Sequence, residues 1–206
     1  YTKIEPKWVL DLGCGTGHFT RILQKRYKKS RVIGVDASER MIACARKKRG
    51  VFHKQQYLHA SANALPFKGF QFDLIFCNLM LPWHHDVPAL FHTLRQQLKA
   101  GGLLLFSTFG PNTLQSVRDS FAKVDTAHRV HTQLDMHDLG DALVQAQFSD
   151  PVVDSESLDL HYRDVDSALN ELKQSGMTQA LVDTHKGLTG KTRFNEFKKA
   201  LSSSKT

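Results

Sequence analysis

The sequence lacks the features of a membrane protein, a secreted scaffold or a metal centre. No apolar run approaches the roughly 20 residues that span a bilayer, and no secretory signal is visible. The three cysteines lie far apart, which favours buried thiols in a reducing compartment over disulfides or zinc ligands. The eleven histidines have no cysteine partners, so we expect scattered surface or pocket positions. We therefore expect a cytoplasmic protein that needs no metal and no membrane.

Two stretches of the chain have little charge of one sign. The formal net charge is +8, yet residues 21–54 hold twelve basic and two acidic residues, whereas residues 135–171 hold ten acidic and one basic. Two interpretations of the basic run remain open. It is either the solvated face of two amphipathic helices or a landing site for an acidic partner. Nucleic acid is the weaker choice of partner, because no aromatic residues interleave with these charges to stack on bases.

Short apolar strands alternate with helical patterns along the chain. This alternation predicts an α/β fold with a doubly wound, mostly parallel sheet and helices on both faces. The 206 residues are enough for a single domain, with its core at 8–110 and a substrate-side and C-terminal part at 111–206. The expected strands are Trp8–Leu12, Arg31–Asp36, Tyr57–Ser61, Phe72–Leu79 and Leu103–Phe109, with a sixth at Val152–Tyr162.

Helical patterns dominate the chain beyond the fifth expected strand. They predict helices near Thr113–Val124, Met136–Gln147, Asp164–Gly176 and Phe194–Leu201. No strand is expected after them. The C-terminal part should therefore consist mainly of helical additions to the sheet.

The most informative motif is V-L-D-L-G-C-G-T-G at residues 9–17. A strand runs into three glycines spaced G-x-G-x-G, and a helical pattern follows at once. Glycine permits a sharp turn and lets a ligand approach where a Cβ atom would collide. Asp11 precedes the glycines, and Asp36 ends the next strand, where a carboxylate can accept both hydroxyls of a ribose. The spacing differs from the dinucleotide motif G-x-G-x-x-G, so we expect a different nucleoside ligand.

Together these residues resemble motif I and the following acidic residue of class I S-adenosylmethionine-dependent methyltransferases. The resemblance implies S-adenosylmethionine as cofactor and S-adenosylhomocysteine as product. The residues that it places around the cofactor are Asp11, Gly13, Cys14, Gly15, Gly17, Asp36, Ala37, Met41, Ser61, Ala62, Asn78 and Leu79. The family also has an N-terminal helix and an antiparallel seventh strand, which we expect to be missing here.

Within this set the resemblance gives each region a role. Asp11 and the backbone of Gly13 and Gly15 would face the methionine end, and Gly17 would permit close helix packing. Asp36 would hold the ribose.

The remaining residues would serve the adenine and the reacting methyl. Ala37 and Met41 would flank the adenine, although Met41 is equally well explained as helix core. Ser61 stands where the family often has Asp, so recognition of the adenine amine there would depend more on the Ala62 backbone. Asn78 and Leu79 would lie beneath the sulfonium.

Three downstream stretches sharpen the resemblance to one family. F-S-T-F-G-P-N-T-L at 106–114, M-H-D-L-G-D-A-L at 136–143 and Y-R-D-V-D-S-A-L-N-E-L-K-Q-S-G at 162–176 are similar to the malonyl-acyl-carrier-protein O-methyltransferases of biotin synthesis. G-L-T-G-K at 187–191 fits as well. This resemblance implies methylation of the free carboxylate of a malonyl thioester on an acidic acyl carrier protein. The alternatives are another small carboxylic acid or a protein as acceptor, or a non-methylating assembly factor of the same fold.

The expected chemistry needs positioning more than proton transfer. A carboxylate is already ionised at pH 7, so no general base is required, and no catalytic residue is certain. A cation should orient the acceptor, preferably an arginine fork. Arg163, Arg129 and Arg193 are the candidates, and Asn78 and Trp83 are further positioning candidates near the methyl.

Overall fold

The computed structural model describes residues 4–50, 54–124, 133–177 and 190–203. The chain divides into two compact units. The first contains Tyr1–Thr108 and Leu139–Val152, and the second contains Phe109–Asp138 and Val153–Thr206. The first unit thus includes residues 8–108 of the core expected at 8–110, together with a later segment of the chain. That the two units make one domain stays a prediction.

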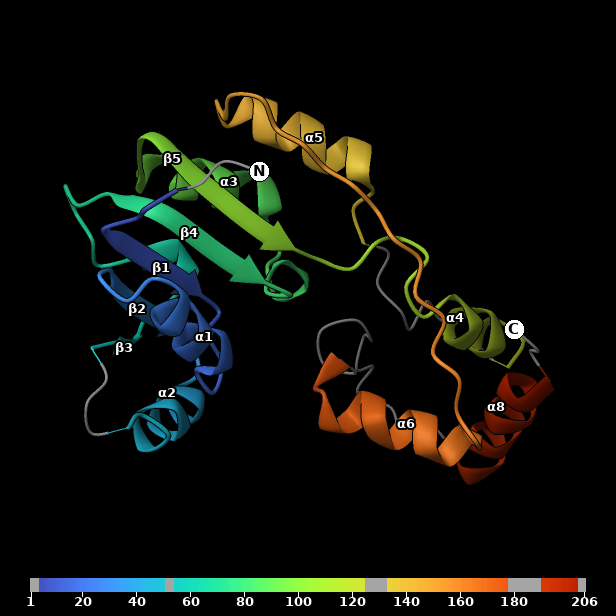
Figure 1. The fold of residues 1–206 in the computed structure, drawn as a ribbon. Helices are drawn as coiled ribbons and strands as arrows, with labels where there is room; N and C mark the ends of the chain where they lie inside the picture. The colour runs from blue at the N-terminus through green and yellow to red at the C-terminus, as the bar shows by residue number, and fades with distance from the viewer. Residues whose placement is uncertain (1–3, 51–53, 125–132, 178–189, 204–206) are drawn as a thin grey trace. The chain divides into compact units, whose positions relative to one another are not determined.

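The first unit is built on a five-stranded sheet (Figure 1). Its strands are β1 (Trp8–Leu12), β2 (Arg31–Asp36), β3 (Gln56–His59), β4 (Phe72–Asn78) and β5 (Leu98–Ser107). They lie in the order β3-β2-β1-β4-β5, and every neighbouring pair is parallel. The chain therefore adds strands outward from β1 to β3 and then resumes on the other side of β1 with β4. This reversal confirms the predicted doubly wound α/β fold, which binds ligands at the strand ends beside the reversal.

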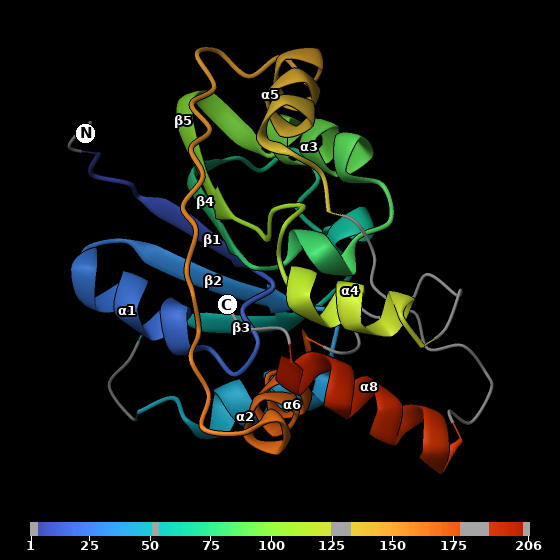
Figure 2. The same cartoon turned by 90° about the vertical axis from the view of Figure 1, so that its right-hand side faces the viewer.

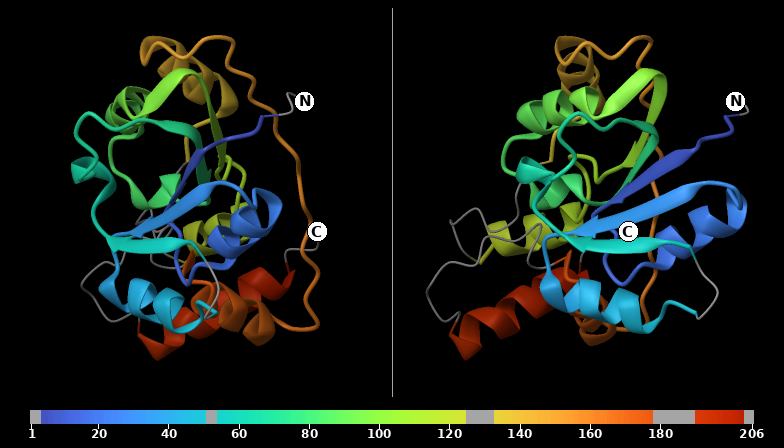
Figure 3. Two further views of the ribbon diagram at one scale, coloured as in Figure 1. Left: turned by 60° about the vertical axis from the view of Figure 1, so that its left-hand side comes forward. Right: turned by 90° about the vertical axis from the view of Figure 1, so that its left-hand side faces the viewer.

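Helices cover both faces of this sheet. On one face lie α1 (His18–Arg26) and α2 (Glu39–Lys47), and Val9, Val32 and Leu74 form a core with Leu23 of α1. On the other face lie α3 (Val87–Gln96) and α5 (Met136–Gln145), which Figure 2 shows together beside β5. The connections β1-α1-β2 and β2-α2-β3 run in the same direction along the sheet, so α1 and α2 lie on one face. The connection β4-α3-β5 runs in the opposite direction and places α3 on the other face, because such connections are right-handed. Figure 3 shows α2 next to β3 at one side of the sheet.

A single carboxylate joins the starts of three strands. Asp73 of β4 accepts hydrogen bonds from the backbone N–H groups of Lys7 (3.0 Å) and Trp8 (2.7 Å), and from the Lys99 ammonium of β5 (2.7 Å). Partial burial by itself raises the pKa of Asp73. The hydrogen bonds from Lys99 and Trp8 outweigh burial and hold the pKa below its usual range.

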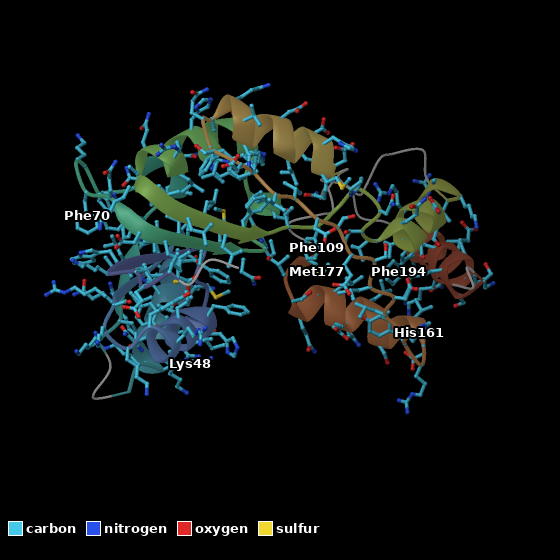
Figure 4. All side chains as sticks on the ribbon, turned by 45° about the horizontal axis from the view of Figure 1, so that its top comes forward. Lys48, Phe70, Phe109, His161, Met177 and Phe194 are labelled. Atoms are coloured by element: carbon cyan, nitrogen blue, oxygen red, sulfur yellow. The ribbon has the colours of Figure 1, made fainter. Side chains whose placement is uncertain are left out.

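The second unit is helical, with α4 (Gln115–Ala122), α6 (Val165–Gln174) and α8 (Lys191–Ser203). Its core contains Val117, Leu172 and Phe197, one from each helix. Phe121 stacks on Phe197 with the ring centroids 3.8 Å apart, and Lys198 of α8 forms an ion pair with Asp166 of α6. Figure 4 labels Met177 and Phe194 among the side chains of this unit. The predicted C-terminal helical additions are therefore confirmed.

The expected sixth strand at Val152–Tyr162 is wrong. The segment has no regular secondary structure, and the side chains of Val152, Leu158 and Leu160 are 89%, 76% and 68% exposed. Apolar residues within this segment suggested a strand, but a strand also needs a neighbour to pair with. Within the described residues, β5 is the last strand. None of the helices in these residues is long and apolar enough to cross a membrane.

Candidate active site

The glycine-rich turn that follows β1 is pinned to the neighbouring strand. The N–H groups of Gly13 and Cys14 both donate to the carbonyl oxygen of Val35 in β2, at 2.8 and 3.0 Å. Gly13, Gly15 and Gly17 have φ angles of 73°, 52° and 74°. These angles lie in the left-handed region, where a Cβ atom would be strained. The sequence motif thus reflects a backbone that only glycine adopts easily.

The three glycines differ in what a side chain would meet. A Cβ atom on Gly13 would lie 2.5 Å from Met80 Cγ, and one on Gly17 would lie 2.5 Å from the Tyr57 hydroxyl oxygen. A Cβ atom on Gly15 would have no heavy atom within 4 Å. Gly13 and Gly17 therefore make room for the protein itself, and the close approach at Gly17 is by Tyr57 of β3. Gly15 instead faces open space, which a bound ligand can fill.

Asp36 ends β2 beside this open space. Its two carboxylate oxygens accept hydrogen bonds from the N–H groups of Gly15 and Ser38, each at 2.8 Å. A carboxylate oxygen has two acceptor positions, so each oxygen keeps one for a further donor such as a ribose hydroxyl. The same contacts fix the carboxylate against the glycine turn. The geometry thus fits the nucleoside role expected for Asp36.

Asp11 lies deeper, at the end of β1. Its side chain is 2% exposed and accepts a 2.5 Å hydrogen bond from the hydroxyl of Thr20, which is itself fully buried in α1. Burial, reinforced by the charge of Asp36, raises the pKa of Asp11 to about 6. Burial also raises the pKa of the Cys14 and Cys77 thiols to about 12, so both are neutral. The expected place of Asp11 at the methionine end of the cofactor stays a prediction.

The residues expected around adenine follow the ends of β2 and β3. Met41 of α2 is 44% exposed, which rules out the alternative interpretation as helix core. Ser61 precedes the short 3-10 helix η1 (Ala62–Ala64), and its hydroxyl accepts from the Asn63 N–H at 3.3 Å. Next to them, the His59 ring nitrogen Nε2 lies 3.0 Å from the Ala37 carbonyl oxygen. His59 is therefore an additional polar group on this side.

The residues at the end of β4 lie at the same edge of the sheet. The Ser107 hydroxyl of β5 donates to Asn78 Oδ1 at 2.7 Å, and the Leu79 N–H donates to the Ser107 carbonyl oxygen at 3.0 Å. Leu79 has a φ of 52° and exposes its side chain. Trp83 ends the 3-10 helix η2 (Leu81–Trp83) and is 51% exposed. All the expected cofactor residues thus belong to the edge where the strands end.

The candidate arginines for the acceptor lie elsewhere in the chain. Arg163 and Arg193 belong to the second unit and are exposed, with Arg163 Nε 3.8 Å from a carboxylate oxygen of Asp164. Arg129 lies outside the described residues. All three stay candidates. Within the described residues, no group of three or more His, Cys, Asp or Glu side chains could hold a metal ion.

Four residues of this edge were missed by sequence reasoning: Thr20, Tyr57, His59 and Ser107. Thr20 carried a usable signal, because a hydroxyl one turn into a helix can reach the strand end that precedes the glycine turn. In the sequence, Tyr57 has the pattern of an ordinary apolar strand residue. Nothing in its sequence context showed that its ring packs against Gly17.

The opposite edge of the sheet, where the strands start, is basic. Helices in such units run antiparallel to the strands, so the ends of α1 and α2 lie at this edge. Lys48, labelled in Figure 4, directly follows α2. The exposed basic residues here are Lys7, Lys25, Arg26, Lys28, Lys29, Arg31, Arg46, Lys47, Lys48, Arg49 and Lys54. Within the described part of the chain, none of them pairs with a carboxylate.

Comparison with known proteins identifies relatives that match most of the chain. Residues 9–102 match a family model described as a methyltransferase domain. The chain is 36% identical over 197 residues to a malonyl-[acyl-carrier protein] O-methyltransferase of Legionella pneumophila, covering 96% of this chain and 69% of that protein. It is 40% identical to malonyl-[acyl-carrier protein] O-methyltransferase 1 of Coxiella burnetii, covering 95% and 66%. The chain thus spans about two thirds of the length of these curated relatives.

Solved structures agree with the fold. An S-adenosylmethionine-dependent methyltransferase from Mesorhizobium loti is 26% identical with a TM-score of 0.58, covering 84% of this chain and 88% of that one. The YcgJ protein of Bacillus subtilis superposes with a TM-score of 0.66 at 22% identity, covering 97% and 78%. The second likeness concerns the fold alone.

Proposed function

We propose a function for this chain from one premise: it belongs to the family of malonyl-[acyl-carrier protein] O-methyltransferases. It is accordingly a methyltransferase that uses S-adenosylmethionine. We infer that its acceptor is the free carboxylate of a malonyl thioester on an acyl carrier protein, and that the methyl ester serves biotin synthesis. The observation that supports the site is the open space at Gly15, directly beside the Asp36 carboxylate.

The residues at the strand ends would hold the cofactor by its nucleoside. Asp36 would accept the ribose hydroxyls on the two acceptor positions left free by Gly15 and Ser38. Ala37 and Met41 would flank the adenine, with Ser61 and Ala62 at its edge. Asn78 and Leu79 would line the methyl-donating end. Because Ser107 holds the Asn78 carbonyl oxygen, the Asn78 amide group is fixed in orientation before any ligand binds.

The reaction itself asks the protein to align and to exclude water. When bound, S-adenosylmethionine would supply a methyl group on a sulfonium, and the residues at the strand ends would hold it toward an oxygen of the acceptor carboxylate. The acceptor is ionised at pH 7, so no side chain has to remove a proton. One of Arg163, Arg193 and Arg129 would orient the acceptor carboxylate through a two-pronged hydrogen bond. Trp83, half exposed after β4, would shield the methyl from water.

We further propose that the carrier protein is acidic and is attracted by the basic edge of the sheet. A pocket of ≈ 410 Å³ opens there, lined by Arg46, Arg49, Gln56 and Tyr57. Its two guanidinium groups each donate to a backbone carbonyl, Arg46 to Tyr57 and Arg49 to Gln55. Their other N–H groups remain suited to carboxylates of a partner. We expect this encounter to take place in the cytoplasm, where Cys14, Cys44 and Cys77 stay free thiols as they are here.

Mass spectrometry of the carrier protein tests this function. The chain is incubated with S-adenosylmethionine and either malonyl-carrier or acetyl-carrier protein. The malonyl form should gain the mass of one added methyl ester, and the acetyl form should not, because it has no free carboxylate. Methylation of both forms, or of neither with cofactor still bound, would refute the malonyl acceptor and point to another substrate.

A further inference from the structure

The site contains a buried carboxylate to which the proposed mechanism gives no task. Asp11 is the penultimate residue of β1 and lies only a few residues before Gly15, yet it is 2% exposed. The Thr20 hydroxyl donates to it at 2.5 Å. Thr20 is fully buried, and its hydroxyl also lies 2.9 Å from where a Cβ atom on Gly34 would be. The hydroxyl is thus confined between α1 and β2 and can hold Asp11 in one orientation.

The groups that face Asp11 carry no compensating positive charge. Asp36 approaches from β2 as a second carboxylate, and the thiols of Cys14 and Cys77 are neutral. On α1, the Arg21 guanidinium donates to the Thr16 carbonyl oxygen at 3.0 Å. Two carboxylates therefore lie near each other at the ends of β1 and β2. Such a pair disfavours ionisation of both members, so near pH 6 Asp11 keeps part of its proton until a cation arrives.

We propose that Thr20 is a positioning residue for cofactor binding: it orients Asp11 so that this carboxylate ionises, releasing its proton to solvent, when the cationic cofactor binds. The carboxyl loses H⁺ to the buffer and becomes the counter-charge of the cofactor. The inference rests on the use of S-adenosylmethionine but not on the identity of the acceptor. Its failure therefore leaves the malonyl proposal untouched.

The physical argument combines burial and hydrogen bonding. Burial disfavours the charged form, so the unliganded pKa of Asp11 lies at about 6. A nearby positive charge favours the ionised form and lowers the pKa. The hydrogen bond from Thr20 acts in the same direction, because a hydroxyl donates more strongly to a carboxylate than to a neutral acid. Without it, Asp11 would remain neutral up to a higher pH.

Calorimetric titration with S-adenosylmethionine tests the proposal without any acceptor. The measurement is made at pH 6 and pH 8 in two buffers that differ in ionisation enthalpy. At pH 6, we expect the difference in binding heat between the two buffers to correspond to release of up to about half a proton. The reason is that about half of Asp11 is protonated near its pKa. At pH 8 the release should nearly vanish. Asp11→Asn should abolish it at both pH values, which separates Asp11 from other titrating groups.

Matched substitutions at Thr20 separate positioning from folding. Thr20→Val keeps the shape and removes the hydroxyl, so it should move proton release to higher pH and weaken binding about tenfold at pH 7, with a smaller loss at pH 8.5. Thr20→Ser should restore the original pH profile. Heat at pH 6 that does not depend on the buffer would overturn the proposal. So would Thr20→Val that binds like the parent at every pH, or that loses affinity equally at every pH.

Discussion

The two edges of the parallel sheet differ in both charge and construction. The edge where the strands end is made of glycine backbone, two carboxylates and an open space at Gly15. Among the residues that the structure describes, the edge where the strands start carries eleven exposed basic side chains and the Asp73 carboxylate, which joins three strands. With five residues in β1 and six in β2, the edges lie roughly 17–20 Å apart. This separation exceeds a Debye length of about 8 Å at physiological salt.

This difference shows how one topology can serve partners of opposite charge. The acidic edge suits a cofactor that carries a sulfonium. The basic edge has two explanations, because cations in the last turns of α1 and α2 also complement the helix dipoles. Helix stabilisation and attraction of an acidic carrier protein predict different effects of charge reversal, so substitution can tell them apart.

The largest effect is expected from Gly17→Ala at the acidic edge. Left-handed backbone costs roughly 1–2 kcal/mol for alanine, and the overlap with Tyr57 adds about 1–3 kcal/mol. Urea denaturation should therefore show a loss of about 2–5 kcal/mol in the free energy of unfolding.

Gly15→Ala is the matched control for that change. Its φ is also positive, but its Cβ atom meets nothing within 4 Å, so only the backbone strain should reduce stability. Cofactor affinity should fall strongly, because the new methyl enters the ligand space. Equal losses of stability at the two glycines would contradict the distinction drawn here.

Asp36→Ala should have the next largest effect, on binding. Losing hydrogen bonds to a charged group should cost at least roughly 1.5–3 kcal/mol, the contribution of one such bond. Calorimetry should then show S-adenosylmethionine binding at least tenfold more weakly. Asp36→Asn keeps one acceptor oxygen, so its affinity for S-adenosylmethionine should lie between that of the parent and that of Asp36→Ala. Unchanged affinity in Asp36→Ala would remove the ribose assignment.

At the basic edge, Asp73→Asn should reduce stability and leave cofactor affinity unchanged. Hydrogen bonds to a charged group are lost or weakened, for an expected loss of about 1–2 kcal/mol in unfolding free energy at pH 7. The folded pKa of Asp73 is lowered, so its stabilisation is present above the unfolded pKa of about 3.9 and disappears as pH falls through the folded pKa. The parent and variant should therefore converge in stability under strongly acidic conditions. A constant difference down to the lowest pH would contradict this origin.

The smallest effect is expected from reversing Lys47, Lys48 and Arg49 to Glu. If the basic edge attracts an acidic carrier, the apparent KM for malonyl-carrier protein should rise about two- to fivefold at low salt and less at high salt. The KM for a small malonyl thioester is the control and should not change. If the charges only stabilise helix ends, stability falls and both substrates are affected alike.

Much of the fold follows from sequence, because each expected strand is a short apolar run followed by a turn or a helix. β1 and β2 agree with their expected bounds. β5 begins at Leu98 instead of Leu103, since its pairing with β4 shifts register between Phe72 and Leu74, which no apolar pattern records. The prediction of a strand at Val152–Tyr162 was wrong, because a strand forms only where another strand, often far away in the chain, is available to pair with it.

The candidate site could be predicted only where backbone geometry imposes a residue type. A glycine at positive φ and a carboxylate at a strand end are two such features that can be recognised in the sequence. The contact of Tyr57 with Gly17 leaves none, because it joins residues 40 positions apart by side-chain packing. The hydrogen bond between Ser107 and Asn78 likewise joins residues far apart in sequence, 29 positions from each other. Such contacts follow from strand order and register, which the structure supplies.

The structure of this chain bound to S-adenosylhomocysteine tests the central claim most directly. The account predicts both ribose hydroxyls within hydrogen-bond distance of the Asp36 carboxylate oxygens, and ligand atoms in the open space beside Gly15. It also predicts the thioether sulfur near the Asn78 and Leu79 end of β4. A ribose that contacts neither Asp36 oxygen, or a ligand bound at the basic edge, would contradict the assignment of the two edges.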